Sequence, residues 1–198
     1  MEFYLARFAR ALSSIGVIFL AGCQGVATEK QATEVSGVSS KAVVGAASCQ
    51  EKFTFQDEKA KTQSLREFDQ DPKGGWRALY NENCFAEAAK LILAYKTRTN
   101  TTDSQLSFHA GQMFAISGDY ASAIKELKLA LVPAAANSGN FLWNDYVLGT
   151  IAFLERDRPR LIRHRDALAA KKESNAPNLR VLNLLIERFD QSYDDATK

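Results

Sequence analysis

The sequence contains only two histidines, and His109 lies near residues that could act with it in catalysis. Asp103, Ser107 and His109 together supply the acid, the hydroxyl and the base of a hydrolytic triad. However, Ser and Asp are common residues, and all three lie within seven positions of the chain, so the combination carries little weight. The sequence shows no glycine-rich phosphate loop, no nucleophile elbow and no paired metal-binding histidines. We therefore predict that the chain is not an enzyme; the alternative is a site that assembles only in three dimensions.

The surroundings of the two histidines also argue against a metal or cofactor site. No Cys, Asp or Glu cluster stands at ligand spacing around His109, so we expect a packing or surface histidine there. His164 lies inside a basic run, which makes it an unlikely general base. We predict no metal and no cofactor.

The first 23 residues have the pattern of a secretory signal. Arg7 and Arg10 precede an apolar run, Ile15 to Ala21, that is too short to span a bilayer. The run ends in Leu20-Ala21-Gly22-Cys23, which resembles the lipobox of bacterial lipoproteins. The resemblance implies that residues 1–22 are removed and that Cys23 carries lipid. The alternative is an ordinary signal peptide whose cleavage site happens to precede a cysteine.

The resemblance also implies a location for the mature chain. Gln24 follows the cysteine where an Asp favours inner-membrane retention in enteric bacteria, so we expect a lipid-anchored protein of the outer membrane that faces the periplasm. Two cysteines remain, Cys49 and Cys84. In an oxidising compartment they are a candidate disulfide, and two buried free thiols are the alternative.

Composition divides the mature chain into three parts. Residues 23–48 comprise Cys23 and a segment without Leu, Ile or aromatic residues, which cannot bury enough apolar area to fold and which we interpret as a flexible tether. Residues 49–75 form an N-terminal arm or cap, with a short helix expected at 58–68. Residues 76–198 form a domain of helical repeats.

The repeats are clearest in Ser104–Leu131, which predicts two amphipathic helices joined by a turn at Ser117–Asp119. Small residues at Gly111 and Ala123 would let the two helix axes approach closely. A hairpin of this kind cannot bury both apolar faces alone, so it needs neighbours. Weaker copies of the pattern occur 35 residues upstream and 38 residues downstream.

This hairpin resembles a tetratricopeptide repeat (TPR), with matches at Gly118, Tyr120, Ala123 and Leu127 and an aromatic at Phe114. Other positions depart from the family pattern, among them Ser107 where a Trp is common. The resemblance implies an all-α fold, a right-handed stack of about three TPR-like hairpins. We expect the third hairpin to comprise helices 144–155 and 159–170, and a capping helix to follow at 178–189.

The resemblance further implies a groove lined by the first helix of each hairpin. Side chains on this face mix aromatic and polar groups suited to an extended peptide or a partner helix. The candidate partner-binding residues are Arg77, Tyr80, Gln112, Tyr146 and Thr150. The alternative is that the aromatic residues on this face form the core between repeats.

A basic run is the second candidate for recognition. It contains Arg156, Arg158, Arg160, Arg163 and Arg165, which could contact anionic lipid, cell-wall carboxylates or an acidic protein surface. The alternative is a solvated helix face with local Arg–Asp pairs. The formal charge of the whole chain is only +2, which argues against a nucleic-acid partner.

Together these features predict a lipid-anchored periplasmic adaptor or scaffold that binds a protein partner in cell-envelope assembly. A lipoprotein that binds cell-wall fragments or another small ligand is the alternative binding function, and an envelope enzyme is the alternative from a different class. An open groove would favour the adaptor, and an enclosed apolar cavity would favour the small ligand.

Overall fold

The computed structural model describes residues 47–137 and 139–198, and Ala47–Lys198 form one compact unit. Within these residues the chain is all-α and contains no strand. Residues 1–46, which include the predicted signal sequence, Cys23 and most of the predicted tether 23–48, lie outside the described residues; at the end of the predicted tether, Ser48 instead caps the first helix. No helix in the described part of the chain has both the length and the apolar character needed to cross a membrane.

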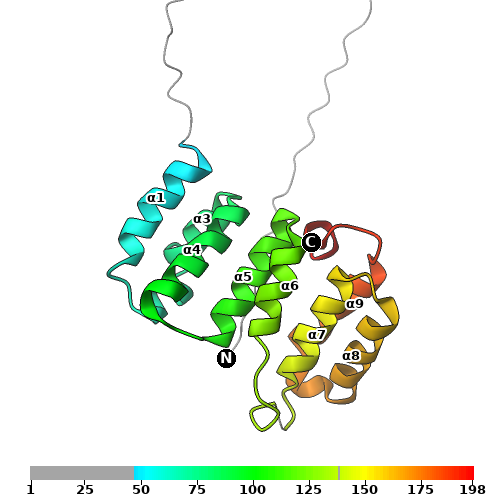
Figure 1. Ribbon diagram of the computed structural model, residues 1–198. Helices are drawn as coiled ribbons and strands as arrows, with labels where there is room; N and C mark the ends of the chain where they lie inside the picture. The colour runs from blue at the N-terminus through cyan, green and yellow to red at the C-terminus, as the bar shows by residue number, and fades with distance from the viewer. Residues whose placement is uncertain (1–46, 138) are drawn as a thin grey trace, which may run out of the picture. The chain divides into compact units, whose positions relative to one another are not determined.

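The hairpins follow one another across Figure 1 in chain order, from α3–α4 beside α1 in cyan to α7–α8 in yellow, and α9 packs against both α7 and α8. Each successive pair, α3–α4, α5–α6 and α7–α8, packs as a hairpin. The helices are α1 (Cys49–Ala60), α2 (Leu65–Gln70), α3 (Gly75–Asn81), α4 (Phe85–Thr99), α5 (Ser104–Ser117), α6 (Tyr120–Leu129), α7 (Trp143–Leu154), α8 (Arg158–Ala170), α9 (Lys172–Glu187) and α10 (Tyr193–Ala196). The prediction of an all-α stack of helical hairpins with a further helix at its end is confirmed.

The three hairpin turns share one backbone conformation. Asn83, Gly118 and Arg156 have φ values of 60°, 88° and 59°, in the left-handed region. They are spaced by the same 35 and 38 residues that separate the repeats in the sequence. The next helix begins two residues later in each case, and at the second and third turns the intervening Asp119 and Asp157 cap it with a side-chain oxygen. The chain therefore builds three equivalent turns, although only one of them has glycine.

Gly111 accounts for the close packing of the second hairpin. A Cβ atom at this position would lie 2.6 Å from Leu127 Cγ and 3.1 Å from the carbonyl oxygen of Ala123, both on α6. Real Cβ atoms do not approach carbon so closely, so only glycine allows α5 and α6 to reach this separation. The expected close approach of the two helices at Gly111 and Ala123 is confirmed.

The N-terminal arm differs from the prediction of a helix at 58–68. Two helices, α1 and α2, occupy this region, and the chain leaves helical geometry between Ala60 and Leu65. Each begins with a capping box: Ser48 with Glu51, and Ser64 with Glu67. These two Ser-x-x-Glu patterns are visible in the sequence and mark both helix starts, so they are the signal that the prediction missed.

The arm is fastened to the first hairpin. Cys49 at the start of α1 and Cys84 at the start of α4 form a disulfide, with sulfur atoms 2.02 Å apart and a sequence separation of 35. The prediction of this pair is confirmed. Helix α1 packs against both α3 and α4, so the cross-link reinforces a contact that is already part of the core.

The last long helix begins earlier than expected. Helix α9 starts at Lys172 rather than near 178, and it accommodates Pro177 inside its first turns. Asn175 lies within this helix and is fully buried; it accepts a hydrogen bond from the Leu142 amide (2.8 Å) and donates to the Asn140 carbonyl (2.6 Å). This asparagine ties α9 to the segment before α7, which sequence spacing could not indicate.

Candidate functional site

A band of aromatic rings crosses the first helices of all three hairpins. On α3, Tyr80 contacts Trp76 with ring centroids 6.2 Å apart, and Trp76 contacts His109 on α5 at 5.0 Å. The neighbouring Phe108 then contacts Trp143 on α7 at 4.9 Å and Tyr146 at 5.2 Å. We call the rings of Tyr80, Trp76, His109, Phe108, Trp143 and Tyr146 the aromatic band. It is the feature of the described structure that links all three hairpins through one kind of side chain.

The rings in the middle of the aromatic band are buried, and those at its two ends are partly exposed. Trp76, Phe108 and Tyr146 are buried, whereas Tyr80 and Trp143 are half-buried. Beyond Trp143 the stacked ring of Phe141 extends the band and exposes 53% of its surface. The two ends are therefore the parts of the band with the most surface to offer a partner.

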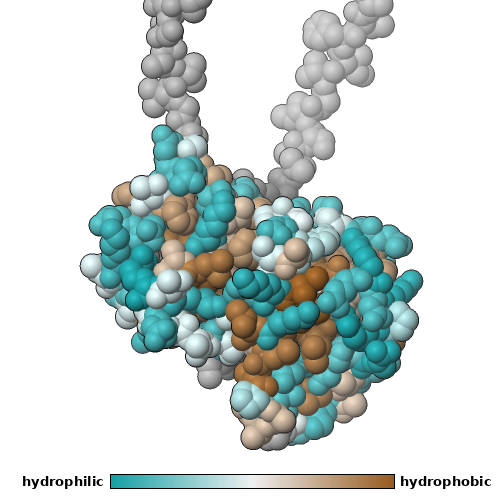
Figure 2. Space-filling model, viewed as in Figure 1, coloured by the Kyte–Doolittle hydropathy of each residue, from teal (hydrophilic) through white to brown (hydrophobic). Residues whose placement is uncertain are grey.

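Figure 2 shows hydrophobic side chains gathered over α6 and α7 on the face toward the viewer. In this part of the chain Leu129, the last residue of α6, and Phe141, just before α7, each expose more than half of their surface. Large apolar side chains exposed close together in this way are typical of interaction surfaces.

The five predicted partner-binding residues lie on the expected helices but differ in accessibility. Arg77 and Tyr80 on α3 are half-buried. Gln112 and Tyr146 expose only 6% of their surfaces and Thr150 none. Thr150 donates its hydroxyl proton to the Tyr146 carbonyl within α7 (3.0 Å). In this conformation Gln112, Tyr146 and Thr150 offer almost no contact area to a partner.

Beside the aromatic band lies a buried polar cluster that the sequence analysis did not anticipate. Asp69 on α2 is 4% exposed, and its Oδ1 accepts hydrogen bonds from Trp76 Nε1 (2.9 Å) and, with the proton on Nδ1, from His109 (2.8 Å). The guanidinium of Arg77 lies 3.6 Å from the same oxygen and 4.1 Å from the centroid of the Trp76 ring. One carboxylate thus holds α2, α3 and α5 together.

The charges of this cluster depend on one another. Burial acts to raise the pKa of Asp69, but the hydrogen bond and charge of His109, the hydrogen bond of Trp76 and the charge of Arg77 outweigh it, so the pKa lies below its usual value. Burial lowers the pKa of Arg77, and the charge of Asp69 opposes this effect. The network favours an ionised Asp69 at neutral pH, as expected for a carboxylate that stabilises packing.

The structure does not bring the candidate triad residues together for catalysis. His109 bonds to Asp69 instead of Asp103, whose carboxylate caps α5 by accepting from the Leu106 amide (2.8 Å). The Ser107 hydroxyl donates to the Asp103 carbonyl and accepts from Lys96 Nζ (2.8 Å). Each of the three side chains therefore has a structural partner. The expectation that His109 is a packing histidine agrees with its burial and contacts.

Lys96 is the centre of a second buried polar contact. Its ammonium group, on α4, bonds to Ser107 on α5 and to the Glu126 carboxylate on α6 (2.8 Å). The Lys96 and Glu126 side chains are 13% and 8% exposed. This ion pair joins the first and second hairpins, and breaking one side of it would leave a buried charge.

Most of the basic run is engaged within the molecule. The Arg156 guanidinium donates to the carbonyl oxygens of Phe189 and Gln191, and Arg158 donates to that of Ile186 (3.5 Å). Arg160 pairs with Glu155 and Asp157, and Arg165 with Asp166 (2.7 Å) and with Asn183 on α9 (3.2 Å). Arg163 is exposed and has no ion-pair partner in the described part of the chain. Four of the five arginines thus bind the protein itself, as in the alternative of local pairing.

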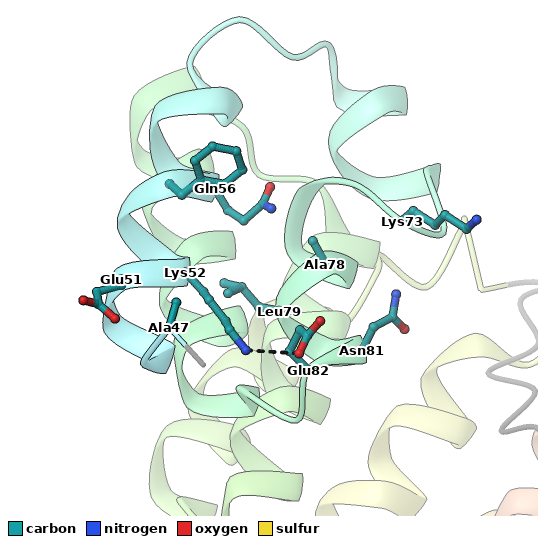
Figure 3. Close-up of a pocket in the computed structure, with 10 residues that line it drawn as sticks. Ala47, Glu51, Lys52, Gln56, Lys73, Ala78, Leu79, Asn81 and Glu82 are labelled. Atoms are coloured by element: carbon teal, nitrogen blue, oxygen red, sulfur yellow. Dashed lines mark hydrogen bonds and ion pairs between the residues drawn. The ribbon is translucent and has the colours of Figure 1, made fainter. Parts of the chain in front are cut away.

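A separate cleft of about 580 Å³ opens between α1 and α3 (Figure 3). The exposed ring of Phe55 and the side chains of Gln56 and Leu79 line it, and an ion pair between Lys52 and Glu82 (3.0 Å) spans it. This cleft lies between the N-terminal arm and the first hairpin, and it contains none of the residues predicted from the sequence to bind a partner.

Within residues 47–137 and 139–198, no three His, Cys, Asp or Glu side chains are placed to hold a metal ion together. Comparison with protein-family models, with curated proteins and with solved structures finds no match for this chain.

Proposed function

We propose that this chain is a lipid-anchored adaptor of a bacterial envelope, which binds a protein partner through the ends of its aromatic band. The single observation that carries the proposal is the band itself, which places aromatic rings along all three hairpins and leaves Tyr80 and Phe141 accessible. Aromatic side chains at the ends of a rigid helical stack supply large contact area at low entropic cost.

The polar groups around the band support a peptide-like partner. Arg77 and Tyr80 add charged and hydroxyl groups at one end, and the indole of Trp143 is already held at the other by the Ala130 carbonyl (2.8 Å). A partner that covers both ends would span the three hairpins, as an extended peptide or a helix could. The lipobox-like sequence before Cys23 supports placing this domain at a membrane surface.

The test is a cross-linked capture of partners from native envelopes with a tagged full chain. Phe141→Ala removes an exposed ring at one end of the band, and Phe55→Ala is the matched control, because Phe55 is 62% exposed on α1 and lies outside the band. We expect the wild type and Phe55→Ala to capture the same protein and Phe141→Ala to capture at least about fivefold less.

Two outcomes would contradict the proposal. If Phe141→Ala captures the partner as well as the wild type does, the band does not form the binding surface. If no protein is captured by any of the three chains, the chain is not an adaptor in that envelope, and the small-ligand function takes its place. Thermal melting of each variant checks that a loss of capture does not come from unfolding.

A further inference from the structure

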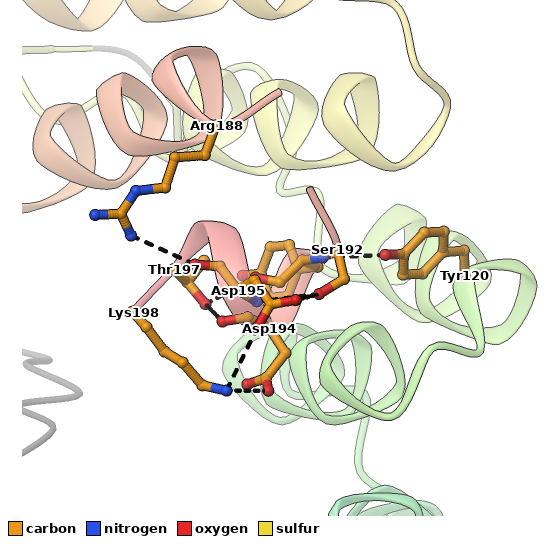
Figure 4. A network of polar contacts seen from close by, with 8 residues as sticks. Tyr120, Arg188, Ser192, Asp194, Asp195, Thr197 and Lys198 are labelled. Atoms are coloured by element: carbon orange, nitrogen blue, oxygen red, sulfur yellow. Dashed lines mark hydrogen bonds and ion pairs between the residues drawn. The ribbon is translucent and has the colours of Figure 1, made fainter. Parts of the chain in front are cut away.

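The C-terminal segment folds back onto the stack. Helix α9 ends at Glu187, the chain turns through residues 188–192, and the short helix α10 packs against α9 and against α5 of the second hairpin. Figure 4 shows α10 between the green helices of the second hairpin and the salmon ribbon of α9. The last seven residues thus lie beside residues more than seventy positions earlier in the sequence.

Two side chains anchor this segment. Tyr193 is 2% exposed, and its ring lies 6.1 Å from that of Phe153 on α7. Its amide donates to the hydroxyl of Tyr120 at the start of α6 (3.0 Å). Ala196, one turn later, is fully buried. The site that receives α10 is therefore made by α5, α6, α7 and α9 together.

This site adjoins the aromatic band. Tyr146 belongs to the band and is buried; burial raises the pKa of its phenol well above the usual value, and the nearby phenol of Tyr193 adds to the shift. On α7, Tyr146 contacts Phe108 of α5, and Phe153 contacts Tyr193 of α10.

The remaining side chains of the segment bond largely among themselves. Ser192 caps α10 by accepting from the Asp195 amide (3.1 Å), and Lys198 pairs with Asp194 and with Asp195 (3.8 Å). From the body of the protein, Arg188 donates to the Asp195 carbonyl (3.4 Å). A four-residue helix is too short to be stable alone, so the helical form of α10 depends on the site that holds it.

We propose that the site filled by α10 is a docking site for a short segment of a partner protein, and that the C-terminus of this chain occupies it until the partner arrives. The segment that fills the site defines the chemistry of the partner: an aromatic anchor, a small residue three positions later, and acidic residues between them, as in Tyr193–Ala196. At the edge of the site Arg188 donates to the Asp195 carbonyl, a backbone acceptor that a docked segment of any sequence would also offer. This inference rests on the proposed adaptor function, because it assumes that the chain binds a protein partner.

Occupation by the tail has a measurable consequence for binding. A segment tethered to its own site competes with an external segment at an effective concentration that reaches the millimolar range for short linkers. Every molecule of the protein carries this competitor. The apparent affinity for an external segment is then reduced by the fraction of molecules in which the tail has left the site. Weakening the tail without touching the site should therefore tighten binding of the same sequence added in trans.

The test uses the full chain, its Tyr193→Ala variant, and a fluorescein-labelled synthetic peptide with the sequence of residues 189–198. Fluorescence anisotropy measures the affinity of each protein for the peptide. We expect Tyr193→Ala to bind the peptide at least about tenfold more tightly than the wild type. The same peptide with Tyr193→Ala should bind neither protein. Lys198→Ala, a change at a half-exposed side chain of the tail, is the matched protein control and should bind as weakly as the wild type.

Two results would overturn the proposal. One is equal affinity of the wild type and Tyr193→Ala for the peptide. The other is loss of the cooperative thermal transition in Tyr193→Ala, which would make α10 part of the core rather than a displaceable segment. The assay needs no envelope partner, so it can fail while the capture experiment succeeds, and the reverse also holds.

Discussion

Asp69 is the residue whose ionisation is most closely linked to the packing of neighbouring helices. Its carboxylate is almost fully enclosed, yet it accepts bonds from Trp76 and His109 and lies beside Arg77. Removing a buried group of this kind leaves its donors unsatisfied, which typically costs more than the bonds themselves contribute. The cluster is therefore a good place to measure how an internal charge supports a helical stack.

We predict that Asp69→Asn lowers the free energy of unfolding at pH 7 by about 2 to 4 kcal/mol. Because the pKa of Asp69 is lower in the folded than in the unfolded chain, its stabilisation is complete above the unfolded value near 3.8. That stabilisation is lost as the pH falls through the folded value. Urea unfolding at pH 7, 5 and 3 should show the difference from the wild type shrinking on the acid side.

Asp57→Asn is the control for this pH series. Asp57 pairs with Arg98 at 3.1 Å, but its side chain is 28% exposed, so the loss should stay below about 1 kcal/mol. A loss at Asp69 that is no larger than at Asp57, or that does not change with pH, would show that the cluster is not ionised as described.

At the scale of helices, the second hairpin depends on the absence of one side chain. We predict that Gly111→Ala destabilises the protein by about 1 to 2 kcal/mol, although alanine is the better helix former. The new Cβ would collide with Leu127 Cγ, which moves only if the whole fully buried side chain changes its χ1 rotamer, and would press on the α6 backbone. Thermal or urea unfolding measures the effect.

Gly149→Ala provides the comparison on α7. Its Cβ would meet the terminal methyl carbons of Leu182 at 2.7 and 3.0 Å, and these can move by rotation of the side chain. We expect a change within about 1 kcal/mol of the wild type, since helix propensity offsets part of the clash. Equal losses at Gly111 and Gly149 would contradict the role assigned to the α5–α6 contact.

The disulfide acts at the same scale, between an arm helix and a hairpin. We predict that reduction of Cys49–Cys84 lowers the free energy of unfolding by about 3 to 4 kcal/mol in the chain-entropy model for a loop of this length. Hydrogen exchange should rise first in α1. In Cys49→Ser the reductant should not change the free energy of unfolding. If it lowers the stability of this variant as much as that of the wild type, the effect does not come from the disulfide.

At the scale of the whole molecule, the proposal of a membrane anchor depends on one residue outside the described structure. We predict that the wild-type chain incorporates labelled palmitate and sediments with envelope membranes, and that Cys23→Ser loses both properties. Cys49→Ser should keep the label, since Cys49 forms the disulfide and is not the predicted site of lipid attachment. A label that survives Cys23→Ser would contradict the prediction, because the lipid would then be attached to a residue other than Cys23.

The repeat organisation was predictable because it is a local property. Apolar spacing of three and four residues, small residues at Gly111 and Ala123, and equal distances between turns need no knowledge of distant contacts. The third turn is an example. Arg156 stands where the repeat pattern has a glycine, and yet this residue, 38 positions after Gly118, adopts the same left-handed backbone conformation. The cysteine pair followed from the count that remained after Cys23.

The candidate site required the tertiary structure. Asp69 and His109 lie forty positions apart, and no pattern in the sequence relates them before α2, α3 and α5 are packed together. The tertiary structure also buries Gln112, Tyr146 and Thr150, which were predicted to line a groove, because side-chain periodicity cannot distinguish a face that meets solvent from one that meets another helix. The place of α10 is likewise a long-range contact, between Tyr193 and Tyr120.

The amino-acid sequence by itself thus determined the three hairpins and the spacing of their turns, since these depend on neighbours along the chain, whereas the arm helices and the start of α9 differ from the prediction. Only the tertiary structure decided which aromatic rings are buried, which arginines are already bound, and where the C-terminus lies. Burial and pairing depend on the few ångströms by which separate helices approach one another. That separation is set by all the packed side chains together.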